Sequence, residues 1–172
     1  MEEMNKFEHE QMMKAKPSIT PLLAILGGVV LITLIWSAVT GLWDALIVFR
    51  IFMGVFFVTF SVFKLLDLKG FAQAYATYDV VAKKVSGYGF FYPFIELWLG
   101  VNYLFHLMPR VTDWVTFLVM GISSVGVLLA LQSKKPFRCA CLGTKINVPM
   151  TTVTLLEDLL MTVMAGIMLL WL

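Results

Sequence analysis

The feature that most constrains this chain is a series of long apolar stretches with few or no charged residues. The first, residues 17–43, carries no charge, and a helix needs about 20 apolar residues to cross a bilayer. Hydrophobic residues make up 60% of the 172 residues and charged residues 14%, against about 25% in an average soluble protein. A soluble domain of this length could not bury so much apolar surface, so we predict an all-α membrane protein.

Five stretches are long enough to cross a membrane. The second contains only Arg50 as a charged residue, the third only Glu96, and the fifth Glu157 and Asp158, while the fourth has none. We therefore expect five transmembrane helices: a four-helix bundle preceded by one additional N-terminal helix. The expected division of the chain is a polar tail over 1–18, the additional helix over 19–43 and the four-helix membrane domain over 44–172.

The basic residues predict how the chain is oriented. Of the 13 Lys and Arg residues, all except Arg50 and Arg110 fall on one side of the five-span arrangement. The positive-inside rule then gives a cytoplasmic N-terminus, a periplasmic C-terminus and a cytoplasmic loop between the fourth and fifth spans. The expected location is the bacterial inner membrane. We expect the helices to contact the lipid bilayer, and we expect no nucleic-acid partner.

The segment between the second and third spans is too charged to cross a membrane. Its residues 65–85, LLDLKGFAQAYATYDVVAKKV, have Phe71, Tyr75, Tyr78 and Ala82 at helical spacing. This pattern predicts an amphipathic helix that lies in the inner interface of the membrane. The alternative is a cytoplasmic helix packed on the bundle.

Charges inside membrane spans are costly and are commonly functional. Arg50 is close enough to the outer end of its span to extend outward to water, or it has a role in the site. Glu96 has no charged neighbour in the sequence. It therefore either pairs with another helix or is protonated because it is removed from water. Its role is either in the functional site or in a structural hydrogen bond.

The acidic pair in the last span has two interpretations. Thr154 and Glu157 match a capping box, in which the two side chains bond to free backbone N–H groups where a helix begins. In the first interpretation the helix starts at Thr154 and Glu157 is a cap. In the second, Glu157 is a site residue. Asp158 is about 100° away around the helix, so we expect at most one of these carboxylates to face a given partner.

The stretch FRCACLGT, residues 137–144, holds both cysteines of the chain, Cys139 and Cys141. The basic neighbours Arg138 and Lys145 favour the thiolate form, which attacks disulfides and binds soft metals. Both chemistries fit: thiol–disulfide exchange, or capture of Cu(I), Hg(II) or Zn(II) with a further ligand such as Glu157 or Met150. His106 falls at the outer end of its helix and is expected to be interfacial. Two buried small side chains are the third possibility.

The order of these features resembles the MauE/DoxX-like redox-associated membrane proteins. The residues that carry the resemblance are Arg50, Lys64, the Pro93-x-x-Glu96-Leu97 stretch and CACLG at 139–143. The resemblance covers about residues 45–172 and implies a four-helix bundle broadly like that of vitamin K epoxide reductases. It also implies thiol–disulfide chemistry at Cys139 and Cys141 with a thioredoxin-like partner, in maturation of the disulfide-rich small subunit of methylamine dehydrogenase.

Three functions follow as hypotheses. In the first, Cys139 and Cys141 exchange disulfides with a thioredoxin-like protein, while Glu96 and Glu157 tune the thiols or move protons. The chain has no second cysteine pair, so a partner would complete the redox circuit. In the second, the same thiolates carry Cu(I) or Hg(II) received from a soluble metallochaperone, as the heavy-metal-associated domains of some relatives suggest. The third is a non-catalytic assembly subunit of the membrane, and whether the chain is an enzyme is left open.

Overall fold

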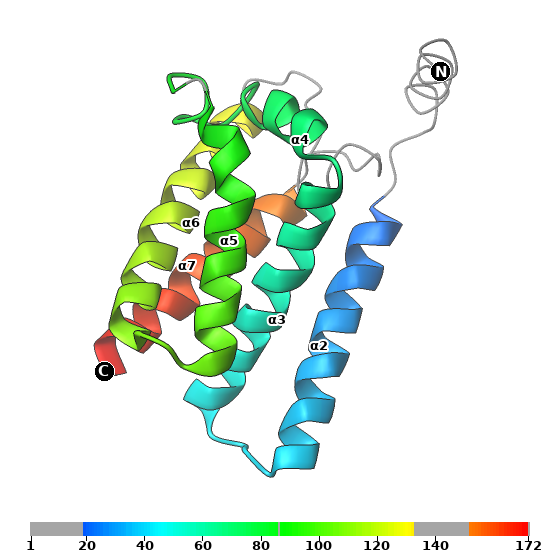
Figure 1. The fold of residues 1–172 in the computed structure, drawn as a ribbon, viewed down its shortest axis with the longest axis vertical. Helices are drawn as coiled ribbons and strands as arrows, with labels where there is room; N and C mark the ends of the chain where they lie inside the picture. The colour runs from blue at the N-terminus through cyan, green and yellow to red at the C-terminus, as the bar shows by residue number, and fades with distance from the viewer. Residues whose placement is uncertain (1–18, 86, 133–151, 172) are drawn as a thin grey trace.

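The computed structural model describes residues 19–85, 87–132 and 152–171. These residues form six helices and no strand, which confirms the all-helical fold (Figure 1). The helices are α2 (Thr20–Thr40), α3 (Ala45–Leu66), α4 (Leu68–Tyr75), α5 (Tyr88–Phe105), α6 (Pro109–Gln132) and α7 (Thr152–Trp171).

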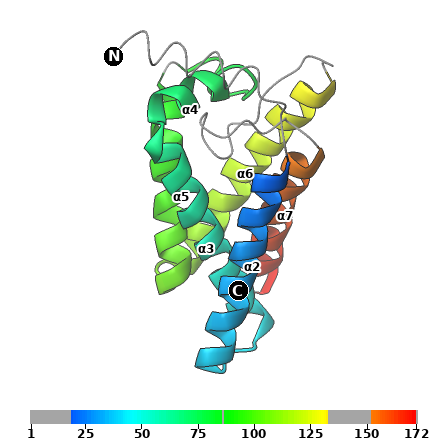
Figure 2. The same ribbon diagram turned by 90° about the vertical axis from the view of Figure 1, so that its right-hand side faces the viewer.

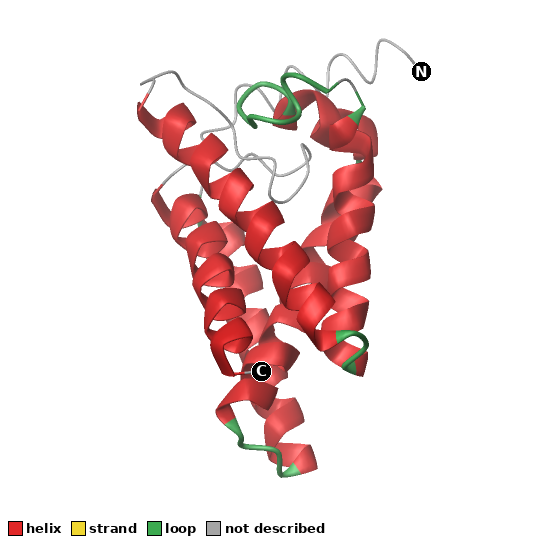
Figure 3. Ribbon diagram, turned by 90° about the vertical axis from the view of Figure 1, so that its left-hand side faces the viewer, coloured by secondary structure: helices red, strands yellow, loops and turns green. Residues whose placement is uncertain are grey.

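Within the described residues, α2, α3 and α6 are long and apolar enough to cross a membrane. The helix α5 has only 18 residues and includes Pro93, Glu96 and Asn102, which lower its mean hydropathy. The helix α7 runs beside α6, and Figure 3 shows the loops gathered at the two ends of the helices. The apolar helices support a membrane protein, and the count of five spans stays a prediction.

The helices run alternately up and down. The two most extensive interfaces join α3 to α5 and α6 to α7. Figure 2 shows α2 on the outside of the bundle, where its packing partner is α3. The short helix α4 lies across the end at which α3 finishes and α5 begins (Figure 1). At this end, called the α4 end below, α6 also finishes and α7 begins, so residues 133–151 leave and rejoin the described bundle there.

Two glycines allow α3 and α5 to approach closely. A Cβ atom on Gly100 would lie 2.9 Å from the backbone nitrogen of Val58, and one on Gly54 would lie 2.7 Å from the side chain of Leu104. Small residues at such crossings let membrane helices gain dispersion contacts, which replace the hydrophobic driving force that lipid removes. The closeness of α3 and α5 positions the polar residues described below.

The outer surface of the bundle is apolar, as expected for contact with lipid. Large hydrophobic side chains on α2, α5 and α6 are exposed, among them Trp36 at 56%, Phe91 at 69% and Leu118 at 55%. The tryptophans Trp43 and Trp171, at the end opposite α4, are exposed as well. This surface is consistent with a bilayer as the medium around the helices.

The segment after α3 differs from the expected amphipathic helix. It is helical only over Leu68–Tyr75 and continues in turns. The four residues predicted on its apolar face, Phe71, Tyr75, Tyr78 and Ala82, are all buried, in a cluster with residues of α5 and α6. Their apolar face therefore packs on the bundle and not on lipid, as in the second of the two alternatives. A position at the membrane interface stays a prediction.

Candidate functional site

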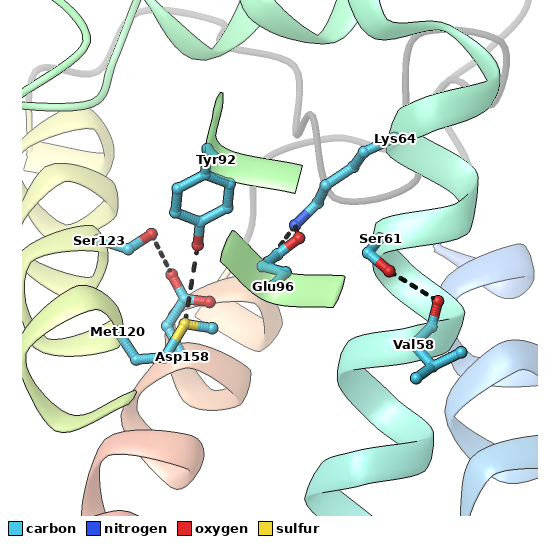
Figure 4. Close-up of polar contacts among 8 residues, drawn as sticks. All are labelled: Val58, Ser61, Lys64, Tyr92, Glu96, Met120, Ser123 and Asp158. Carbon is cyan, nitrogen blue, oxygen red and sulfur yellow. Dashed lines mark hydrogen bonds and ion pairs between the residues drawn. The ribbon is translucent and has the colours of Figure 1, made fainter. Parts of the chain in front are cut away.

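An ion pair between Lys64 and Glu96 lies at the α4 end. Lys64 is in the last turn of α3, and its Nζ donates to Oε1 and Oε2 of Glu96 on α5 at 2.5 and 2.6 Å (Figure 4). The two residues are 6% and 1% exposed. Glu96 therefore pairs with another helix, which is the first of the two environments expected for it. Lys64 lies in the last turn of α3 and not in the segment that follows it.

Aromatic rings close off this ion pair. The Nζ atom of Lys64 lies 5.4 Å from the ring centroid of Phe71 and 4.9 Å from that of Tyr92. Both rings are buried, and their faces attract the ammonium group. The rings also exclude water, which strengthens the attraction between Lys64 and Glu96.

A second polar pair joins α6 to α7. Ser123 donates to Oδ2 of Asp158 at 2.9 Å. Tyr92 comes from α5, and its hydroxyl lies 3.7 Å from the sulfur of Met120 and within electrostatic range of Glu96 and Asp158. Figure 4 shows the Tyr92 hydroxyl directed into the space between the two polar pairs. Four helices, α3, α5, α6 and α7, thus bring polar side chains together around Tyr92.

Glu157 lies at the same end and is not a helix cap. The helix α7 begins at Thr152, two residues before the start that the capping-box interpretation requires, so Glu157 belongs to the body of the helix. Glu157 is 7% exposed, and its Oε1 has no hydrogen-bond partner in the described part of the chain. Of the two neighbouring carboxylates, Asp158 accepts a hydrogen bond from Ser123, whereas Oε1 of Glu157 accepts none in the described residues. The expectation that at most one of them faces a given partner stays a prediction.

A different ion pair lies at the opposite end of the bundle. The Nη2 atom of Arg50 on α3 donates to Oδ2 of Asp113 on α6 at 2.9 Å. Arg50 therefore does not extend outward to water, which corrects one of the two environments expected for it. Nearby, Tyr103 donates to Thr116 at 3.1 Å, so two polar contacts join the helices at this end.

Several members of these clusters were not predicted from the sequence. Asp113 precedes the apolar run that begins at Trp114, so the sequence pattern did not mark it as a charge inside a span. A signal for it existed, since a buried arginine requires an acid at the same depth. The roles of Lys64 and Tyr92 depend on which helix faces which, and no sequence signal gives that.

The structure brings Glu96 and Glu157 to the same end of the bundle. Cys139 and Cys141 lie outside the described residues, so their predicted role at the site stays a prediction. Within the described residues, His, Asp and Glu side chains form no group of three or more that could hold a metal ion.

Together these features define an all-helical membrane protein with buried ion pairs at both ends of one bundle. The chain belongs to the MauE family, because the family model described as methylamine utilisation protein MauE matches residues 44–172, about three quarters of the chain. This match confirms the resemblance inferred from the sequence, and it leaves α2 outside. No curated protein and no solved structure matches the chain.

Proposed function

We propose that this protein exchanges disulfides with a thioredoxin-like partner through Cys139 and Cys141, as a maturation step linked to methylamine utilisation. One observation carries the proposal. The segment with both thiols, residues 133–151, leaves α6 and enters α7 at the α4 end. The buried carboxylates and Lys64 lie at that end, so the polar groups that thiol chemistry uses are close to where this segment attaches.

The proposed chemistry transfers one electron pair. The thiolate of one cysteine attacks the disulfide of the partner, a mixed disulfide forms and one partner sulfur leaves as a thiolate. The other cysteine then attacks the mixed disulfide, so that the Cys139–Cys141 disulfide forms and the second partner sulfur leaves. The cysteine pair is oxidised and the partner is reduced, and the reverse sequence runs in the opposite redox direction.

Glu96 and Glu157 have different roles in this proposal. Both carboxylate oxygens of Glu96 accept bonds from Lys64, so Glu96 fixes the position of that positive charge. Glu157 has an oxygen without a partner in the described residues and supplies a group that exchanges protons with the thiols. A positive charge at this end favours the thiolate, as do the basic neighbours Arg138 and Lys145 in the sequence.

We propose in addition that α5 and α7 cross the membrane, so that all five long helices are spans. The basic residues then place the α4 end and the thiol loop on the cytoplasmic side of the inner membrane. Thiols are kept reduced in that compartment. The disulfide would therefore be a transient intermediate in exchange with the partner, and it would not serve as a structural bond.

The proposal is tested by trapping the mixed disulfide. The chain has only two cysteines, so Cys139→Ser and Cys141→Ser each leave a single thiol that cannot resolve a mixed disulfide. We expect at least one of these variants to form a covalent complex with a thioredoxin-like protein whose resolving cysteine is serine and whose attacking cysteine is activated as a mixed disulfide with thionitrobenzoate. The remaining thiol of this chain attacks the activated sulfur, thionitrobenzoate leaves, and the complex is detected on a non-reducing gel. The double variant is the matched control and should form none.

Failure of both single variants to form this complex would contradict the exchange function. The side of the membrane is measured separately, by labelling intact cells with an impermeant thiol reagent. Labelling of Cys141 from outside would overturn the cytoplasmic orientation and leave the exchange chemistry in place.

A second candidate function is soft-metal transport. Five methionines are buried in the core of the bundle, and thioethers, like thiolates, are ligands for Cu(I). The residues are Met53, Met120, Met161, Met164 and Met168. Binding of Cu(I) or Hg(II) to the purified, reduced protein, and its loss in the double cysteine variant, would support this function over disulfide exchange.

A further inference from the structure

We infer that Glu157 and Asp158 form a buried proton-binding site that holds an exchangeable proton at neutral pH, with the proton on Glu157. The inference is based on the position of the two carboxylates, which lie at the same end of the bundle as the Lys64–Glu96 pair. The use of this proton in thiol exchange rests on the function proposed above, whereas the proton site itself does not.

The balance of charge at the α4 end requires a proton. Lys64 is the only cation that the described residues place within this group. It bonds to Glu96, and its charge also acts on Glu157 and Asp158. Glu96 already neutralises Lys64 through two hydrogen bonds. Among the described residues, two neighbouring carboxylates then remain without a counter-charge, and such carboxylates cannot both ionise out of water.

The hydrogen bonds indicate which carboxylate carries the proton. Asp158 accepts a bond from Ser123 at 2.9 Å, and a donor to a carboxylate favours its ionised form. Glu157 is 7% exposed, and its Oε1 has no donor in the described residues. A neutral carboxyl group costs far less to bury than a charged one, so the proton belongs on Glu157.

The surrounding elements support protonation. Four groups act directly on the two carboxylates: Lys64 from α3, Asp79 from the turns after α4, Glu96 from α5 and the neutral Ser123 from α6. Tyr92 on α5 also interacts with Asp158, and the phenols of Tyr75 on α4 and Tyr88 on α5 interact with Tyr92. The neighbouring charge of Asp158 opposes a second negative charge on Glu157, and the charge of Lys64 favours one.

In the exchange reaction proposed above, Glu157 gives up this proton in the first step and regains a proton in the second. When the first cysteine attacks, the partner thiolate that leaves takes the proton of Glu157. The second cysteine thiol then gives its proton to the Glu157 carboxylate, and its thiolate attacks the mixed disulfide. The site ends each cycle with the proton with which it started, and two electrons have moved from the cysteine pair to the partner.

Infrared spectroscopy of the purified protein in lipid vesicles at neutral pH tests the site. A protonated carboxyl group has a C=O stretching band separate from that of a carboxylate, and the band shifts in D₂O when the proton exchanges. We expect this band in the wild type, its loss in Glu157→Gln, and its retention in Asp44→Asn, which changes an exposed carboxylate. The variant Cys139→Ser/Cys141→Ser should keep the band, because the site does not depend on the thiols.

Two results would overturn the proton site. One is the absence of the band in the wild type, and the other is a band that Glu157→Gln leaves unchanged while the variant remains helical by circular dichroism. If the band is absent but appears once Lys134, Lys135, Arg138 and Lys145 are replaced by glutamine, a basic side chain and not a proton neutralises the site.

The link to thiol chemistry has its own readout. We expect the Glu157 band to change when the wild-type dithiol is oxidised to the disulfide, and not to change when the double cysteine variant is treated in the same way. A band that is present but insensitive to oxidation would overturn the link to the thiols and leave the proton site standing. Failure of mixed-disulfide trapping with the band present would likewise separate the two proposals.

Discussion

Arg50 and Asp113 form a buried ion pair that ties α3 to α6, with 2.9 Å between Nη2 and Oδ2 and side-chain exposures of 9% and 0%. At the other end of α3, Lys64 bonds to Glu96 and ties the same helix to α5. The two cations are fourteen residues apart, or about 21 Å along the axis at 1.5 Å per residue. The helix α3 is thus held at both ends, by a different partner helix at each.

Removing one charge of the Arg50–Asp113 pair should destabilise the bundle strongly. The variant Asp113→Asn leaves the buried guanidinium without a counter-charge, and breaking a buried pair in this way costs about 3–5 kcal/mol. The free energy of unfolding in mixed detergent micelles measures the effect. The control is Lys84→Gln, which changes an exposed cation and should alter stability by less than about 0.5 kcal/mol. Equal effects of the two substitutions would contradict the structural role of the pair.

The Lys64–Glu96 pair allows a sharper experiment with a double variant. Lys64→Met and Glu96→Leu should each cost about 3–5 kcal/mol because each leaves a charge buried alone, whereas the double variant should come within about 1–2 kcal/mol of the wild type. A double-mutant cycle on unfolding free energies gives the coupling between the two residues. Additive losses would mean that the two side chains do not interact in the folded bundle.

The close approach of α3 and α5 predicts a position-specific cost for adding a methyl group. In Gly100→Ala the new Cβ would lie 2.9 Å from the backbone nitrogen of Val58, and backbone cannot move aside, so we expect a loss of about 1–3 kcal/mol. In the control Gly121→Ala, the nearest atom is a side-chain carbon of Thr162 at 3.8 Å, and stability should be unchanged or higher. The reverse order of stabilities would mean that α3 and α5 do not cross at Gly100.

The buried phenol of Tyr75 predicts a loss of stability in alkali. Burial, more than the neighbouring Tyr92 and Asp79, raises the pKa of the Tyr75 phenol well above its ordinary value of 10.0. The unfolded chain therefore releases this proton at a lower pH than the folded chain does. The free energy of unfolding should fall as pH rises through about 10, and Tyr75→Phe should reduce that slope. A slope that Tyr75→Phe leaves unchanged would show that the phenol is not buried as described.

The apolar runs predicted the all-helical fold because each is long enough for a membrane helix, and backbone polar groups in lipid must bond within the helix. The residues Arg50, Lys64 and Glu96, together with the CACLG turn, pointed to the MauE family. The length of the segment after α3 was misjudged, because helical spacing of Phe71, Tyr75 and Tyr78 occurs both in a long helix and in a short helix followed by turns. Its apolar side chains form one buried cluster, and the sequence grouped them on one face without deciding whether that face meets lipid or the bundle.

The sequence by itself determined the membrane environment, the all-helical fold class and the presence of charges inside the apolar stretches, since all of these depend on local composition. Only the tertiary structure decided how those charges pair, because pairing depends on which faces meet. Lys64 meets Glu96 where α3 packs closely on α5, as the contact at Gly100 shows. Arg50 reaches Asp113 on α6 through its long side chain. Residues adjacent in sequence, Glu157 and Asp158, differ for the same reason: Ser123 on α6 reaches Asp158, while an oxygen of Glu157 has no partner in the described residues.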